Sequence, residues 1–92
     1  MKLRGRPKKY RVVSLEPRIR QFSPRGRPGR PEEIGLTIDE FEAIRLADYN
    51  GLSQKEAGKS MQISQQTFSR TLQKAHKTVA DALLKGKIIK IK

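Results

Sequence analysis

The chain has 92 residues, with 21 Lys and Arg against 9 Asp and Glu for a net charge of +12, and it contains no Cys. This length allows one small domain, and the lack of Cys excludes disulfides, thiolate metal sites and cysteine nucleophiles. No apolar run approaches the length of a membrane span, and the basic N-terminus lacks the apolar segment of a secretory signal, so we expect a cytoplasmic protein associated with the nucleoid.

The charge is segregated along the chain. Residues 1–31 contain eleven basic side chains and one acidic side chain. Residues 32–64 contain three basic and seven acidic side chains, and residues 65–92 contain seven basic side chains and one acidic one. A purely solubilising charge would explain the total but not the segregation. The pattern therefore predicts a surface that faces a polyanion.

Residues 1–35 are predicted to form an extended basic arm. They hold all five Pro and four of the seven Gly, which disfavour helix. Arg-Gly-Arg-Pro occurs at residues 4–7 and 25–28 and resembles the core of an AT-hook, a motif that enters narrow minor grooves. Phosphate contact is favoured over minor-groove insertion. The arm residues expected to make either contact are Arg4, Arg6, Arg25 and Arg27.

Residues 36–51 are predicted to form the first helix. Thr37 and Glu40 have the spacing of a capping box, with Leu36 and Phe41 placed for a hydrophobic staple. Asn50-Gly51 supplies a left-handed stop. The acidic residues of the first turns should complement the helix dipole, and they are Asp39, Glu40 and Glu42.

Residues 52–92 predict two further helices and a strand. Ser53 with Glu56 forms a second capping box, and Ser64 marks the start of a helix from Gln65 to Lys85. The apolar stripe of that helix is Phe68, Leu72, Ala75, Val79 and Leu83. Gly86 is the expected C′ residue. Residues 87–92 read as a short strand, and its candidate partner is the strand-like run Tyr10–Leu15 in the same chain or a second one.

The short helix, the tight turn and the longer helix are typical of a helix-turn-helix. Gly58 supplies the small residue needed where the second helix crosses close by, Ile63 the apolar residue in the turn, and Phe68 the apolar anchor of the second helix. The alternative is an ordinary helical hairpin without a role in DNA binding.

The helix face opposite the apolar stripe carries Gln66, Arg70, Gln73 and Lys77. Gln pairs bidentately with adenine and Arg with guanine, whereas a solvated helix face is the alternative. The residues predicted to contact bases or the groove are Gln65, Gln66, Ser69, Arg70 and Gln73. Those predicted to contact phosphate are Lys55, Lys74 and Lys77.

From Leu36 to Lys90 the chain resembles a small prokaryotic family of uncharacterised, predicted DNA-binding proteins, whose helix-turn-helix is similar to region four of bacterial sigma factors. The segments that carry the resemblance are residues 36–48, 51–57, 67–70 with Ser64, 79–83 and 86–87, and upstream residues 11–12, 17, 22, 24–26 and 28 also follow the family pattern, so that nearly the whole chain is covered. The resemblance implies a helical DNA-binding domain and transcriptional regulation. The family usually has Ala at the position of Gly58 and Gly at the position of Gln62. We therefore expect a left-handed conformation or an altered turn at Gln62.

The sequence therefore predicts a mainly α fold: a three-helix, sigma region-four-like helix-turn-helix domain over residues 36–92, with the arm over 1–35 and a C-terminal strand. The expected function is DNA binding and transcriptional regulation by a homodimer, with helix 65–85 in the major groove. The alternatives are an adaptor that contacts RNA polymerase and a protein that binds structured RNA. No cofactor, metal site or enzymatic activity is expected, because the single His76 lacks other ligands and no nucleophile–base pair is present.

Overall fold

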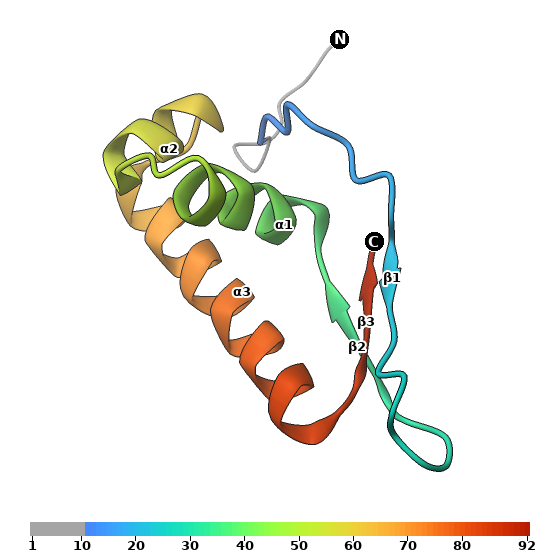
Figure 1. Cartoon of the computed structure of the whole chain (residues 1–92). Helices are drawn as coiled ribbons and strands as arrows, with labels where there is room; N and C mark the ends of the chain where they lie inside the picture. The colour runs from blue at the N-terminus through green and yellow to red at the C-terminus, as the bar shows by residue number, and fades with distance from the viewer. Residues whose placement is uncertain (1–10) are drawn as a thin grey trace, which may run out of the picture.

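Two short strands precede the helices and a third follows them, and the computed structural model describes residues 11–92 (Figure 1). The strands β1 (Gln21–Phe22) and β2 (Glu33–Leu36) come first. The helix α1 (Ile38–Ile44) then continues into the π-helical segment η1 (Arg45–Tyr49). The remaining elements are α2 (Gln54–Ser60), α3 (Gln65–Lys85) and β3 (Ile88–Ile91).

The helix starts follow from their caps. The hydroxyls of Thr37, Ser53 and Ser64 each accept a hydrogen bond from the backbone N–H three residues later. Both predicted capping boxes are present, because Glu40 and Glu56 accept a bond from the N–H of their cap residue. The predicted span of the long helix is confirmed, and it ends at Gly86 with φ 65°.

The first predicted helix differs from its prediction in its last turn. Its hydrogen bonds widen after Ile44, so that the N–H of Asn50 donates to the carbonyl of Arg45 five residues earlier, at 2.9 Å. The chain then leaves the helix through Gly51, whose φ is 75°. The predicted left-handed end of the helix at Asn50-Gly51 is therefore confirmed at Gly51, but the π-helical turn before it was not predicted.

The turn between α2 and α3 depends on two unusual backbone positions. A Cβ on Gly58 would lie 3.1 Å from the carbonyl oxygen of Ile63 and 3.3 Å from that of Ser64, so the close approach expected at this glycine is confirmed. Gln62 has φ 57° and is the one non-glycine residue with positive φ among residues 11–92. Gln62 therefore adopts the left-handed conformation expected at this position, at a steric cost that glycine would not have.

A three-stranded sheet lies beside α3, with strand order β1-β3-β2. β3 pairs antiparallel with β1, with Phe22 opposite Ile89, and parallel with β2, with Leu36 opposite Ile91. The predicted C-terminal strand is confirmed, but its predicted partner is wrong. Residues 11–15 contain no strand, and Tyr10 lies outside the described residues. The strands that pair with β3 are instead β1 and β2, which lie wholly or mostly in the segment predicted to be an extended arm. The predicted boundary between residues 35 and 36 falls inside β2.

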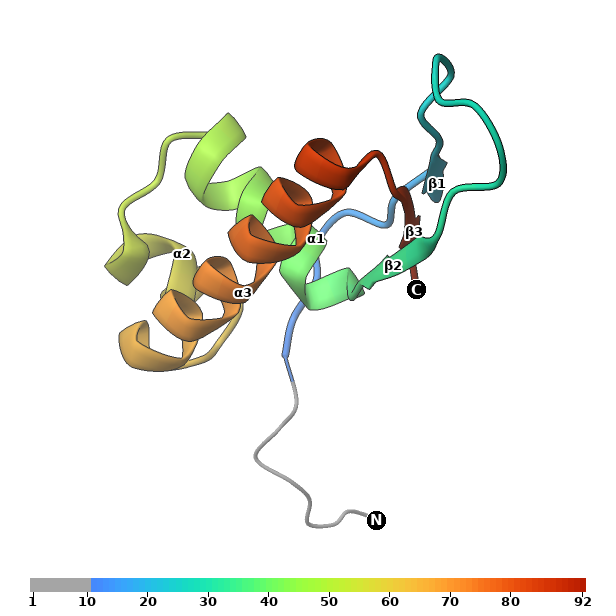
Figure 2. The ribbon, with the colours of Figure 1, turned by 90° about the horizontal axis from the view of Figure 1, so that it is seen from below.

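Two clusters of apolar side chains flank α3. Phe68 and Leu72 pack with Ala57 and Met61 from the side of α2. Ala75 packs with Leu36 and Ile91 of the sheet. Seen from below, α2 and the sheet lie at opposite ends of α3 (Figure 2). The long helix is therefore the element that both clusters share.

Residues 11–17 are fixed to the helices, largely through a buried carboxylate. Glu42 is fully buried and accepts two 2.8 Å hydrogen bonds from Arg45 and one from the backbone N–H of Ser14 at 2.9 Å. The backbone N–H of Val12 donates to the carbonyl of Met61, and Pro17 is buried. The reading of residues 1–35 as an arm is therefore wrong for this segment, and the role of Glu42 goes beyond the helix dipole.

Burial by itself would raise the pKa of Glu42, but the hydrogen bonds from Arg45 and from the backbone at Ser14 and Leu15, together with the charge of Arg45, lower it below its ordinary value of 4.5. On acidification the unfolded chain is protonated first and the native carboxylate later. The stabilisation by Glu42 is therefore fully present above about pH 5 and is lost as the pH falls through the lowered native value.

We predict that Glu42→Gln destabilises the fold by about 2 kcal/mol near neutral pH, because it removes a buried, charge-assisted network. The variant should also lose less stability than wild type as the pH falls below 4.5. Urea unfolding at several pH values measures both effects. Glu33→Gln is the control, because Glu33 is exposed and its contact with Lys90 is 3.6 Å. Equal stability of the two variants at neutral pH would contradict the prediction.

We also predict that Gln62→Gly raises stability by about 0.5–1 kcal/mol. Glycine removes the steric cost of the left-handed conformation, although it increases the entropy of the unfolded chain. Gln62→Ala keeps the Cβ and is the matched control, with a change expected within about 0.5 kcal/mol. Thermal unfolding of the three proteins side by side is the measurement, and a Gly variant less stable than the Ala variant would refute the strain argument.

Candidate nucleic-acid interface

The face of α3 that points away from both clusters carries the residues predicted to contact bases. Phe68, Leu72 and Ala75 are buried and fix the rotation of the helix about its axis. The side chains of Gln65, Gln66, Arg70 and Gln73 are exposed, and Ser69 is partly exposed. The structure thus brings the five residues together along one side of the N-terminal half of α3.

The N-terminal residues of α3 meet α2 at a shallow groove. Gln54 at the start of α2 lines this groove with Gln65, Gln66 and Ser69, and its volume is about 390 Å³. Gln54 was not among the predicted contact residues. Its spacing within α2 does not predict this position, because only the close crossing of the two helices at Gly58 brings it beside α3.

The lysines predicted to contact phosphate are available in the structure. Lys55, Lys74 and Lys77 are exposed, and within residues 11–92 none of them forms an ion pair. The same holds for Arg70 in that part of the chain. The positive charges on this side of α2 and α3 are therefore not neutralised by the described residues.

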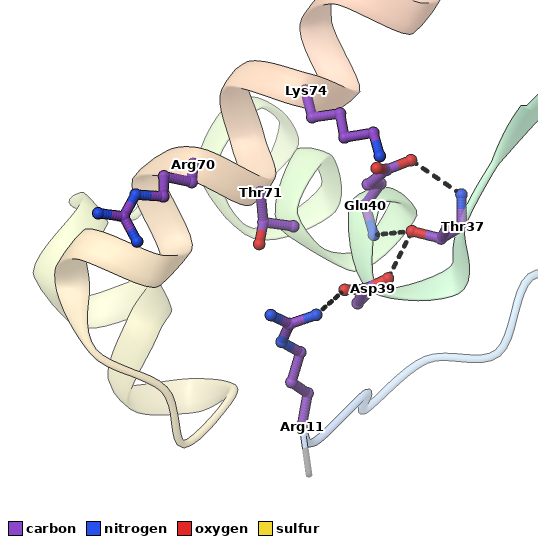
Figure 3. Close-up of a pocket in the computed structure, with 7 residues that line it drawn as sticks. All are labelled: Arg11, Thr37, Asp39, Glu40, Arg70, Thr71 and Lys74. Atoms are coloured by element: carbon purple, nitrogen blue, oxygen red, sulfur yellow. Dashed lines mark hydrogen bonds and ion pairs between the residues drawn. The ribbon is translucent and has the colours of Figure 1, made fainter. Parts of the chain in front are cut away.

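A second pocket opens where α3 passes α1 and the N-terminal segment (Figure 3). Its cationic residues are Arg70 and Lys74 from α3 and Arg11 from the N-terminal segment. Arg11 is held by a short ion pair with Asp39, and its Nε is buried without a hydrogen-bond partner. Arg11 therefore lies beside the basic residues of α3 with its charge balanced by Asp39, a placement that only the fold of residues 11–17 makes visible.

The carboxylates near this face are already engaged. Asp39 binds Arg11 and the hydroxyl of Thr37, and Glu40 accepts the N–H of Thr37. Hydrogen bonds from the backbone and hydroxyl of Ser53 lower the pKa of Glu56. These acids are thereby used in capping and pairing, and their oxygens are partly occupied within the protein.

The arm residues are divided by the structure. Arg27 donates a 2.6 Å hydrogen bond to the carbonyl of Lys85, which places it at the C-terminal end of α3, nineteen residues and about 28 Å along the helix from Gln66. Arg25 is exposed in the loop between β1 and β2. Arg4 and Arg6 lie outside the described residues. Arg27 is thus remote from the predicted base contacts.

The one histidine contacts a carboxylate. His76 Nε2 lies 2.7 Å from Asp48 Oδ2, and both side chains are about half exposed. Within residues 11–92 no group of three His, Asp or Glu side chains is arranged to bind a metal ion. None of the helices described is both long enough and apolar enough to span a membrane.

The chain belongs to the family described as "Protein of unknown function DUF134", whose model matches residues 1–92. It is 54% identical over 87 residues to a "UPF0251 protein" of Desulfosudis oleivorans, covering 94% of this chain and 63% of the relative. It is 50% identical over 88 residues to a "UPF0251 protein" of Prosthecochloris aestuarii, covering 95% of this chain and 57% of the relative. It is 51% identical over 87 residues to a "UPF0251 protein" of Methanosarcina acetivorans, covering 94% of this chain and 53% of the relative.

The chain therefore spans little more than half the length of these curated relatives. No solved structure matched it.

Proposed function

We propose that the protein binds double-stranded DNA and regulates transcription, with α2, the turn and α3 acting as a helix-turn-helix of the sigma region-four kind. In this proposal the N-terminal half of α3 lies in the major groove, and basic side chains of both helices contact phosphate. The observation that carries the proposal is the row of Gln66, Arg70 and Gln73, exposed on one side of α3 beside lysines without partners among the described residues.

The chemistry of this row suits base edges. An amide can donate and accept at adenine, and a guanidinium can donate twice to guanine. A merely solvated helix of a soluble protein usually mixes acidic and basic side chains, whereas residues 65–80 carry no Asp or Glu. A face that is polar, uncharged or basic, and free of carboxylates is suited to a polyanionic groove.

The hydrogen bonds of the α1 carboxylates favour duplex DNA over the alternative of an adaptor that contacts RNA polymerase. An adaptor would present the acidic side of that helix to its partner. Asp39, Glu40 and Glu42 are instead bound to groups of the protein itself. Structured RNA remains a competitor of duplex DNA, since phosphate contacts alone do not distinguish them, and competition between the two in one binding assay separates them.

Arg70→Ala should relax base preference, because it removes a bidentate donor at the centre of the row; a good bidentate pair discriminates by about 1–3 kcal/mol. Selection from a random duplex library, followed by titration on the selected and scrambled sequences, measures the ratio of affinities. Lys85→Ala is the matched control, since Lys85 contacts Asp81 at 3.4 Å and lies at the far end of α3. An unchanged ratio for Arg70→Ala would remove this residue from base readout.

Deletion of residues 2–9 should weaken binding to all duplexes alike and flatten the dependence of log K on log salt. The deleted segment has five basic residues, namely Lys2, Arg4, Arg6, Lys8 and Lys9, and each phosphate contact contributes about 0.9 to the slope. A deletion through residue 31 is unsuitable, because it removes β1 and the contacts of Arg11 and Ser14. A full-length protein with no salt dependence would overturn DNA binding itself.

A further inference from the structure

The loop that joins β1 to β2 carries a concentration of arginine. Residues 23–31 contain three Arg and no Asp or Glu, and they include the second of the two Arg-Gly-Arg-Pro repeats. In both views the loop lies at the end of the molecule away from α2 (Figure 1, Figure 2). It is therefore separate from the row of residues on α3 that is proposed to contact bases, and the proposed function assigns it no role.

The loop is anchored to the end of α3 and to the sheet. Arg27 donates a 2.6 Å hydrogen bond to the carbonyl of Lys85, and its side chain lies over Gly86, where a Cβ would come within 3.1 Å of it. Before the loop, β1 pairs with β3. After the loop, the backbone N–H of Ile88 donates to the carbonyl of Glu32 at 2.8 Å. The arginines are thus presented by a segment that is part of the fold.

The carboxylates at the end of α3 and directly after the loop are paired with lysines. The contacts are those of Asp81 with Lys85 at 3.4 Å and with Lys87 at 2.7 Å, of Glu32 with Lys87 at 3.8 Å, and of Glu33 with Lys90 at 3.6 Å. Arg25 and Arg30 are exposed, and neither forms an ion pair within residues 11–92. Two such cations in a loop that has no carboxylate of its own are suited to a polyanion.

We propose that this loop is a second phosphate-binding site for duplex DNA, in which Arg25 and Arg30 contact the backbone without reading bases. The proposal rests on the DNA binding proposed above and adds a contact at the opposite end of α3 from Gln66. Insertion of the repeat into a minor groove would use both of its arginines and would have to break the bond from Arg27 to Lys85. Phosphate contact by Arg25 and Arg30 requires no such change, so Arg27 is left out of the assigned contacts.

The salt dependence of binding to a random-sequence duplex tests the proposal. Each phosphate contact contributes about 0.9 to the slope of log K against log salt, so Arg25→Ala/Arg30→Ala should lower the slope by about 1.8 and weaken binding about sixtyfold at about 0.1 M salt. Arg20→Ala/Lys90→Ala is the matched control, because it removes the same charge from side chains that already pair with carboxylates. Its slope should stay within about 0.5 of that of wild type.

A lysine variant separates phosphate contact from recognition that needs a guanidinium. Arg25→Lys/Arg30→Lys keeps both charges, so it should keep the wild-type slope, because counterion release depends on charge. Far-UV circular dichroism checks that each variant is folded. If the double alanine variant unfolds, Arg25→Ala alone supplies the same test, with a slope lower by about 0.9.

Four results would overturn the proposal: a wild-type slope in the double alanine variant, an equal loss of slope in the control, a lysine variant that behaves like the alanine variant, or an effect on structured RNA but not on duplex DNA. The base-preference test with Arg70→Ala is independent, because a loop that does not read bases leaves the ratio of affinities unchanged. Loss of base preference as a property of α3 and loss of the loop effect are therefore distinguishable, whereas a wild type that binds no duplex contradicts both proposals.

Discussion

Burial of one side of α3 is the constraint on which the other features depend. Phe68 and Leu72 anchor its first half among the helices, and Ala75 anchors its middle against the sheet. Two anchors so spaced leave the helix no freedom to rotate about its axis. The identity of every outward residue is then fixed, from Gln66 at one end to Leu84 at the other. Any function assigned to that outer side is therefore a consequence of how the inner side packs.

The sequence predicts well those features that local chemistry decides. A serine or threonine hydroxyl reaches only the N–H groups two or three residues ahead, so the starts of α1, α2 and α3 could be read from Thr37, Ser53 and Ser64. Pairing in the sheet is not local. β2 contains a glycine and a glutamate, β1 has two residues, and both join β3 from more than fifty residues away. No periodicity in such short segments distinguishes them from loop, and the run at residues 10–15 looked more strand-like than either.

The acidic residues of α1 show the same boundary between local and non-local information. Glu40 caps its own helix, as its spacing from Thr37 indicated. Asp39 and Glu42 occur in the same turns, yet their partners include Arg11 and the backbone of Ser14, twenty-eight residues earlier. Those contacts turn a stretch of basic arm into part of the folded domain. They also place Arg11, paired with Asp39, in one pocket with Arg70 and Lys74, so the surroundings of the candidate interface depend on a segment that the helices alone do not reveal.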